Sequence, residues 1–156
     1  MATALVHDLA EALADAGWRA ARFDYRGVGR SAGEYGQGEG EAADAAAVAD
    51  ALAEESGRPP TLVGYSFGGA VACRLAATHA VSRLVLVATP LLLPKARLRP
   101  AEDARRVSAP AHLVIGDRDP FVPPGEARRL AAAFRPPAGL DVVPGAGHFL
   151  DRDHHA

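Results

Sequence analysis

The 156-residue chain has little cysteine, no long hydrophobic run and no excess of positive charge, and each scarcity excludes a class of protein. Its one cysteine, Cys73, cannot form an internal disulfide. No apolar run approaches the roughly 18 residues of a membrane-spanning helix. A formal net charge of -2, without a basic stripe, argues against a nucleic-acid surface. Met1 is not followed by a basic stretch and an apolar core, so we expect no secretory signal and a cytoplasmic protein.

Alanine dominates what is present. Of the 76 apolar residues 35 are alanine, which leaves 41 larger ones to build a core. A chain of this length corresponds to one domain of ordinary size. We therefore predict a single domain over residues 1–156, with a thin core.

Alanine-rich segments with helical spacing alternate with short apolar runs. Leu5, Leu9 and Leu13 are spaced four residues apart, and Gly17 follows where a helix would end. The alternation predicts an α/β fold with an open, mostly parallel sheet of about five strands. The predicted strands are 19–25, 61–65, 83–88, 111–115 and 140–143, the further helices are about 40–55, 67–79 and 125–134, and 90–106 is a connection with one helical turn.

The most informative motif is G-x-S-x-G at residues 64–68, between a predicted strand and a predicted helix. To present the Ser66 hydroxyl above the strand ends, the chain must turn sharply and hold Ser66 in a strained conformation. Gly64 and Gly68 are expected to remove Cβ atoms that would collide in this turn. The Phe67 N–H then points into the site from the helix start, where the dipole favours a developing oxyanion. The alternative is that the small residues only allow close helix packing.

A nucleophilic serine needs a base and an acid that orients the base, and in this arrangement the acid precedes the histidine in the chain. Asp117 and Asp119 follow the fourth predicted strand, and His148 follows the fifth in a glycine-rich loop. The carboxyl ends of parallel strands meet at one edge of a sheet, so these side chains should lie near Ser66. Asp119 is favoured as the acid because it lies later in its loop. Asp117 is the alternative, and its other role would be to cap its own turn.

Four segments stand in an order that resembles the α/β-hydrolase superfamily: residues 23–31, 64–69, 116–123 and 145–149. The chain is most similar to small bacterial hydrolases related to dienelactone hydrolases and to esterase-like enzymes. By this resemblance Ser66 matches the nucleophile, Asp119 the acid and His148 the base. The Phe67 amide matches one oxyanion donor. No cofactor and no metal is implied.

The resemblance implies a serine hydrolase that cleaves a small ester, thioester or amide through an acyl-enzyme on Ser66. Its partner is then a small acyl substrate, with neither a nucleic acid nor a membrane. Dienelactone hydrolases themselves use a cysteine nucleophile, so that activity is not expected with a serine at this position. Cys73 is expected to be a small buried residue.

The family's N-terminal strands have no counterpart here, nor has the loop, often His-Gly-like, that supplies its second oxyanion donor. We therefore expect a hydrolase fold truncated at the N-terminus. The segment 19–25 would pair directly with the strand at 61–65, or that strand would keep an unpaired edge. A homodimer is one way to complete the sheet. The alternative function is a non-catalytic binding or assembly module.

Three other features favour structural interpretations. Asp24 and Arg26 are close enough to tie their turn together. The glycine-rich segment 36–40 lacks the lysine of a phosphate loop, so we predict a flexible loop entering a helix. The C-terminal residues carry metal-ligand types but are typical of a solvated tail; they are Asp151, Asp153, His154 and His155.

Overall fold

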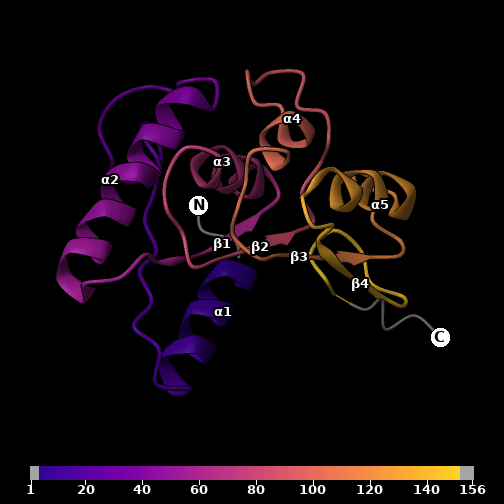
Figure 1. Ribbon diagram of the computed structural model, residues 1–156, viewed down its shortest axis with the longest axis horizontal. Helices are drawn as coiled ribbons and strands as arrows, with labels where there is room; N and C mark the ends of the chain where they lie inside the picture. The colour runs from indigo at the N-terminus through magenta and orange to yellow at the C-terminus, as the bar shows by residue number, and fades with distance from the viewer. Residues whose placement is uncertain (1–3, 152–156) are drawn as a thin grey trace.

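The computed structural model describes residues 4–151, so the predicted tail lies outside the described residues apart from Asp151. Figure 1 shows the order of the elements along this part of the chain. They are α1 (Ala4–Asp15), α2 (Glu39–Ser56), β1 (Thr61–Tyr65), α3 (Phe67–Ala76), β2 (Arg83–Val87), α4 (Pro100–Ala104), β3 (Ala111–Gly116), α5 (Pro124–Ala133) and β4 (Gly139–Val143).

The four strands form one parallel sheet in the order β1-β2-β3-β4. Each new strand is added on the same side of the last one. Crossovers between parallel strands are right-handed, so all of these connections must pass over the same face of the sheet. Figure 1 shows this result: the crossover helices α3, α4 and α5 lie on one side of the strands and α1 on the other, while α2, which precedes β1, packs against α3. The predicted open α/β architecture is confirmed.

The helix-covered face contains the main core. Leu84, Leu86 and Leu113 project from β2 and β3 and are almost fully buried, together with Leu130 and Phe134 from α5 and its end. A second cluster joins α2 to α3 through alanines, including Ala45 and Ala49. Small side chains let these two helices approach closely, which gives the high alanine content a packing role.

The opposite face of the sheet is only partly covered. Side chains alternate along a strand, so Val63, Val85 and His112 point to this side in neighbouring register. Val63 is 40% exposed. The helix on this side, α1, has no buried residue. Its leucine stripe, predicted from the spacing, is therefore only half-buried.

The predicted strand at residues 19–25 is wrong. This segment is irregular, residues 19–24 are exposed, and within the described residues β1 pairs only with β2. Polar groups of the segment bond to partners outside the sheet. Arg19 pairs with Glu55 on α2, and the Ser31 hydroxyl donates to the Asp24 carbonyl. Of the two expected outcomes, β1 keeps an unpaired outer edge in the described part of the chain.

The loop before α2 is held by charged groups rather than by the predicted Asp24–Arg26 contact. The Arg26 guanidinium instead forms a two-pronged ion pair with Asp44, at 2.7 Å in its shortest contact. This contact lowers the pKa of Asp44. Within the glycine-rich segment, the amides of Gly36 and Gly38 donate to the buried Glu41 carboxylate. The loop does enter a helix, and Glu41 fixes that entry.

Most other predicted elements are present with ends shifted by one to three residues. The strand at 61–65 has the predicted bounds, and the helical turn in 90–106 is α4. Among residues 4–151 no helix is both long and apolar enough to cross a membrane. Cys73 is buried, and burial together with the charge of Asp103 raises its pKa to about 12.

Candidate functional site

Ser66 occupies the turn between β1 and α3, at the carboxyl edge of the sheet. Its backbone has φ 51° and ψ −118°, in the left-handed range that side chains rarely adopt. Two backbone hydrogen bonds hold it there: Ser66 N–H donates to Val87 O at 2.8 Å, and Gly69 N–H donates to Ser66 O at 3.0 Å. The strain predicted from the motif is therefore present, and the neighbouring strand and helix maintain it.

The glycines around Ser66 differ in how much space their surroundings leave for a Cβ atom. A Cβ on Gly64 would overlap the α3 backbone, with Gly69 Cα 2.5 Å away. A Cβ on Gly69 would collide with the side chain of Thr89, which follows β2. Gly68 is not crowded, because its nearest neighbour, the Tyr25 hydroxyl, would lie at an ordinary 3.6 Å. The expectation that Gly68 prevents a collision is thus wrong.

Ser66, His148 and Asp119 form one hydrogen-bonded chain, although they follow three different strands. His148 Nδ1 lies 2.7 Å from Asp119 Oδ2, and His148 Nε2 lies 3.1 Å from Ser66 Oγ. The other Asp119 oxygen accepts backbone N–H bonds from Phe121 at 2.8 Å and Val122 at 3.0 Å. An ionised Asp119 only accepts, so Nδ1 carries the proton and Nε2 is free to accept from the Ser66 hydroxyl.

Asp119 is 4% exposed, and its carboxylate would be costly to bury without partners. Two backbone amides and the imidazole N–H supply these partners. The loop after β3 therefore presents a carboxylate that is fixed in position and faces His148.

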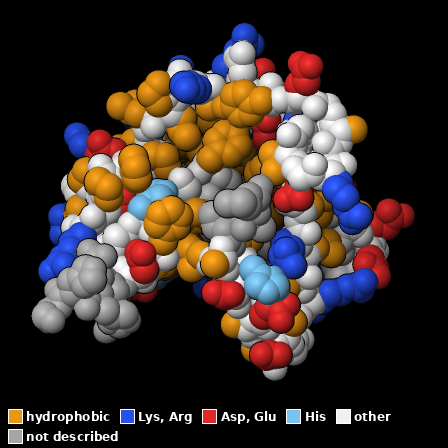
Figure 2. All heavy atoms as spheres, turned by 180° about the vertical axis from the view of Figure 1, so that it is seen from behind, with side chains coloured by type: hydrophobic (Ala, Val, Ile, Leu, Met, Phe, Trp, Pro, Cys, Tyr) orange, Lys and Arg blue, Asp and Glu red, His pale blue; other side chains and the backbone are white. Residues whose placement is uncertain are grey.

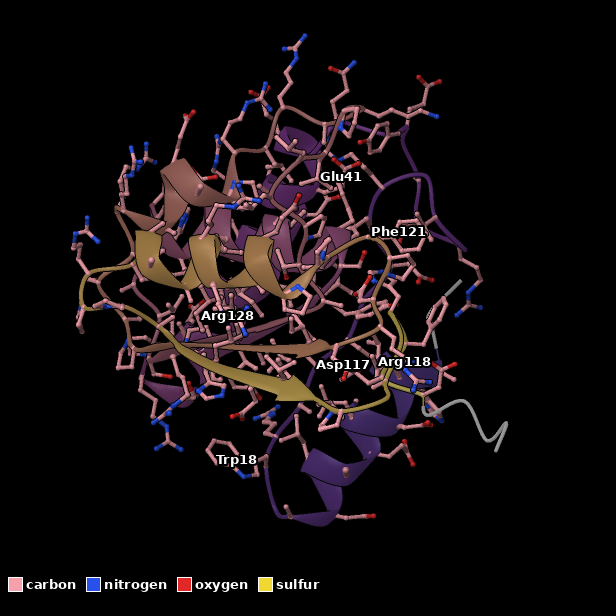
Figure 3. The ribbon with its side chains drawn as sticks, turned by 90° about the vertical axis from the view of Figure 1, so that its right-hand side faces the viewer. Trp18, Glu41, Asp117, Arg118, Phe121 and Arg128 are labelled. Carbon is pink, nitrogen blue, oxygen red and sulfur yellow. The ribbon has the colours of Figure 1, made fainter. Side chains whose placement is uncertain are left out.

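Asp117 does not contact His148. Its carboxylate instead accepts the Gly145 N–H at 2.7 Å, and so joins the loop after β3 to the loop after β4. Two backbone bonds reinforce this junction, from Asp117 N–H to Val143 O and from Arg118 N–H to Ala146 O. Figure 3 shows Asp117 and Arg118 near the arrowhead end of the strands. Of the two candidate acids, Asp119 is the one beside the histidine.

Phe67, the first residue of α3, has a backbone N–H without an acceptor inside its own helix. The side chain of Phe67 packs against Tyr25 and Tyr35, with ring centroids 6.0 and 6.1 Å away. Burial, with the charges of Glu41 and Asp44 nearby, raises the pKa of Tyr25 to about 12. These neutral aromatic side chains fix the start of α3 beside Ser66.

Tyr65 is a site residue that the sequence did not single out. Its ring lies 5.3 Å from the His148 ring and 6.3 Å from that of Phe149, so it supports the histidine loop from the less covered face. Burial raises the Tyr65 pKa, and the charges of Asp119 and Asp151 add to the effect. Its buried hydroxyl has no hydrogen-bond partner among the described residues. As the variable position of G-x-S-x-G, it carried no sequence signal.

A cavity of about 340 Å³ opens beside these groups, lined by Ser66, His148, Pro90, Leu92 and Phe121. Pro90 and Leu92 belong to the connection after β2, where Ala88 has φ 47° and redirects the chain. Apart from His148, the side chains that line the cavity are apolar or neutral.

A larger hollow, about 470 Å³, lies near the opposite end of β1, between the ends of α2 and α3. Its polar residues include Asp50, Glu54, Arg58 and His79. Among the described residues it contains no hydrogen-bonded serine, histidine and carboxylate. The smaller cavity is therefore the candidate functional site.

Comparison with known proteins gives consistent results. Residues 2–111, which include the Ser66 turn, match the family model described as alpha/beta hydrolase fold. Uncharacterized proteins of two Mycobacterium tuberculosis strains are 36% identical over 160 residues. The alignment covers 90% of this chain but 57% of each relative, so the chain spans little more than half of their length.

Solved structures show the same relation. An alpha-beta serine hydrolase homologue from Coxiella burnetii is 32% identical, with a TM-score of 0.81 over 93% of this chain and 68% of that one. A serine hydrolase without a lid from Xanthomonas campestris is 28% identical, with a TM-score of 0.68 over 83% of this chain and 57% of that one. On the family match, the sequence identity and the shared fold, the chain belongs to the alpha/beta hydrolase fold family.

Proposed function

We propose that this chain is a serine hydrolase that cleaves small esters, thioesters or amides through an acyl-enzyme on Ser66. The observation that carries the proposal is the hydrogen-bonded chain from Asp119 through His148 to Ser66. Unrelated serine hydrolases use the same three roles, and the roles depend on geometry rather than on sequence position. The serine hydrolase relatives from Coxiella and Xanthomonas support the same chemistry.

In the first half of the reaction, Ser66 Oγ attacks the substrate carbonyl carbon while His148 Nε2 takes the hydroxyl proton. Asp119 holds Nδ1–H and stabilises the imidazolium that forms. The Phe67 N–H donates to the oxyanion of the tetrahedral intermediate. When that intermediate collapses, His148 returns the proton to the departing alcohol, thiol or amine. The acyl group remains on Ser66.

In the second half, His148 takes a proton from water, and the resulting hydroxide attacks the acyl carbon. Collapse of the second intermediate breaks the bond to Ser66 Oγ, which recovers its proton from His148. The carboxylic acid product then leaves. The two half-reactions together consume one water molecule and otherwise use only groups present on this chain.

The test is covalent labelling with a fluorophosphonate, with the modified residue identified by mass spectrometry. We expect the adduct on Ser66 and turnover of p-nitrophenyl acetate. Ser66→Ala should abolish the adduct and lower kcat by a factor on the order of 10⁴–10⁶. The matched control is Ser108→Ala, at an exposed serine between α4 and β3. It should label and turn over like the wild type. A folded wild-type protein with neither adduct nor turnover would overturn the proposal.

The alternative function is a non-catalytic binding or assembly module, and the outer edge of β1, which no strand pairs within residues 4–151, favours it. In that case two copies would pair through β1 in a homodimer, with Val63 near the two-fold axis. Light scattering after size exclusion measures the mass directly. A dimer that Val63→Pro converts to a monomer, together with no labelling of Ser66, would favour this alternative over the hydrolase.

A further inference from the structure

We propose that Leu92 and Phe121 set the substrate selectivity of the site, Leu92 for the acyl group and Phe121 for the leaving group. Both positions favour uncharged, apolar substituents. The inference rests on the proposed acyl transfer at Ser66 and names the substrate class that this transfer uses.

Leu92 and Phe121 are large apolar side chains that are open to water at the cavity itself. Leu92 is 75% exposed and Phe121 is 67% exposed, yet both line the cavity that contains Ser66 and His148. Side chains so exposed contribute little to the core. They would lose water contact only when a ligand fills the cavity, and an apolar ligand gains most from that burial.

The surroundings of these two residues agree with an uncharged ligand. Besides His148, the cavity is lined by Ser66, Pro90, Leu92 and Phe121, none of which carries a charge. A charged substituent placed against this wall would lose hydration without gaining an ion pair. Figure 2 shows one face of the molecule, on which hydrophobic side chains gather over the upper middle and charged ones lie around the margins and across the lower part.

The reaction geometry assigns each residue to one part of the substrate. At the tetrahedral carbon, one substituent is Ser66 Oγ, and the oxyanion faces the Phe67 N–H. The leaving group must face His148 Nε2, which protonates it. Phe121 packs edge-on against the His148 ring, with centroids 5.0 Å apart at 72°, so it borders the leaving group. Leu92, with Pro90, forms the remaining wall and borders the acyl chain.

The expected size of the effect follows from apolar burial. One fully buried methylene favours binding by at most about fourfold, and an open wall provides less. We therefore expect wild-type kcat/KM to rise about fivefold from p-nitrophenyl acetate to butyrate. Along alkyl acetates we expect a similar rise from ethyl to butyl. Both rises should level off as the chain outgrows the cavity.

The test measures both series on two variants. Leu92→Ser should flatten the acyl series and leave the ratio of the alkyl acetates in place, whereas Phe121→Ser should do the reverse. The control is Trp18→Ser, which also removes a large exposed apolar side chain. Figure 3 shows Trp18 below the sheet, away from Phe121. Trp18→Ser should change neither ratio.

A third variant tests charge. Leu92→Lys keeps much of the aliphatic stem and adds a positive charge at the acyl wall. It should raise kcat/KM for p-nitrophenyl hemisuccinate relative to the butyrate ester by about fivefold, the effect of one exposed ion pair. Trp18→Lys is the matched control and should leave this ratio unchanged.

The results distinguish failure of the Leu92 and Phe121 assignment from failure of the hydrolase proposal. Chain-length ratios near one in the wild type, or equal changes of both ratios in both variants, overturn the assignment of Leu92 and Phe121 while the hydrolase proposal stands. No turnover of any ester and no fluorophosphonate adduct means that the proposed function itself has failed. Opposite, selective changes in the two variants support the inference.

Discussion

The two faces of the sheet are built from the same four strands but differ in what covers them. On one face α3, α4 and α5 bury Leu84, Leu86 and Leu113, whereas on the other Val63 is 40% exposed and α1 has no buried residue. The difference follows from topology, because strands added in one direction with right-handed crossovers place every connecting helix on one side. Stability should therefore come almost entirely from one face.

The candidate site draws on both faces but unequally. Ser66 is held by the close approach of Gly64 to α3 on the covered face. The His148 loop is supported on the other face by Tyr65, whose ring it contacts. The hydrogen-bonded Ser66, His148 and Asp119 thus lie together at the carboxyl edge, even where the second face is exposed farther down the strands.

Truncating an apolar side chain to alanine should cost far more stability on the covered face than on the opposite one. Leu84→Ala removes a fully buried side chain from the covered face, and should lower the free energy of unfolding by about 2–5 kcal/mol. Val63→Ala, on the opposite face, should cost less than about 1 kcal/mol because the side chain is already partly in water. Equilibrium urea denaturation followed by circular dichroism measures both. Equal costs would mean that the second face is covered in solution.

Asp117 joins the two loops that carry Asp119 and His148. Asp117→Ala removes the acceptor for Gly145 N–H, a bond contributing about 1 kcal/mol. If that bond positions His148, ester turnover should fall about fivefold in kcat with KM little changed. Asp117→Asn keeps an acceptor oxygen and should restore most of kcat. A loss of stability in Asp117→Ala with unchanged kcat would show that the bond has no positioning role.

Short sequence patterns predicted the parts of the fold that depend on neighbouring residues in the chain. The strand at 61–65, the turn at Ser66 and the order of acid and histidine were all readable, because alternation, glycine spacing and strand ends are sequence properties. The structure brings Asp119 and His148 to Ser66, although their roles in catalysis stay a prediction. Tyr65 and Leu92 carried no signal, since contacts of this kind depend on how distant loops meet.

The predicted strand at 19–25 fails for a related reason. A strand needs a partner edge, and a short apolar run cannot reveal whether one is available. Arg26 illustrates the same limit: it was assigned to a contact two residues away, yet its partner Asp44 lies in the following helix. Long side chains in loops find the nearest opposite charge in space, which sequence proximity does not identify.

The attachment of this loop to α2 predicts a pH dependence. The ion pair with Arg26 lowers the pKa of Asp44 in the folded state relative to the unfolded chain. Its contribution to stability is then complete above the ordinary aspartate pKa of about 4, and is lost as the pH falls through the lower folded value. The difference in unfolding free energy between wild type and Asp44→Asn should be largest near neutral pH and shrink below about pH 4. Urea denaturation across this range measures it, and a pH-independent difference would contradict the prediction.

A large loss of stability from a substitution on α1 would contradict the difference between the two faces. Leu9 lies in the half-buried stripe of a helix without a buried residue, so Leu9→Ser should lower the free energy of unfolding by about 1 kcal/mol or less. Leu130→Ser, in the fully buried stripe of α5, is the matched control and should cost several-fold more. Urea denaturation compares the two. If Leu9→Ser instead cost about 2 kcal/mol or more, α1 would pack firmly on the sheet in solution, and both faces would contribute to stability.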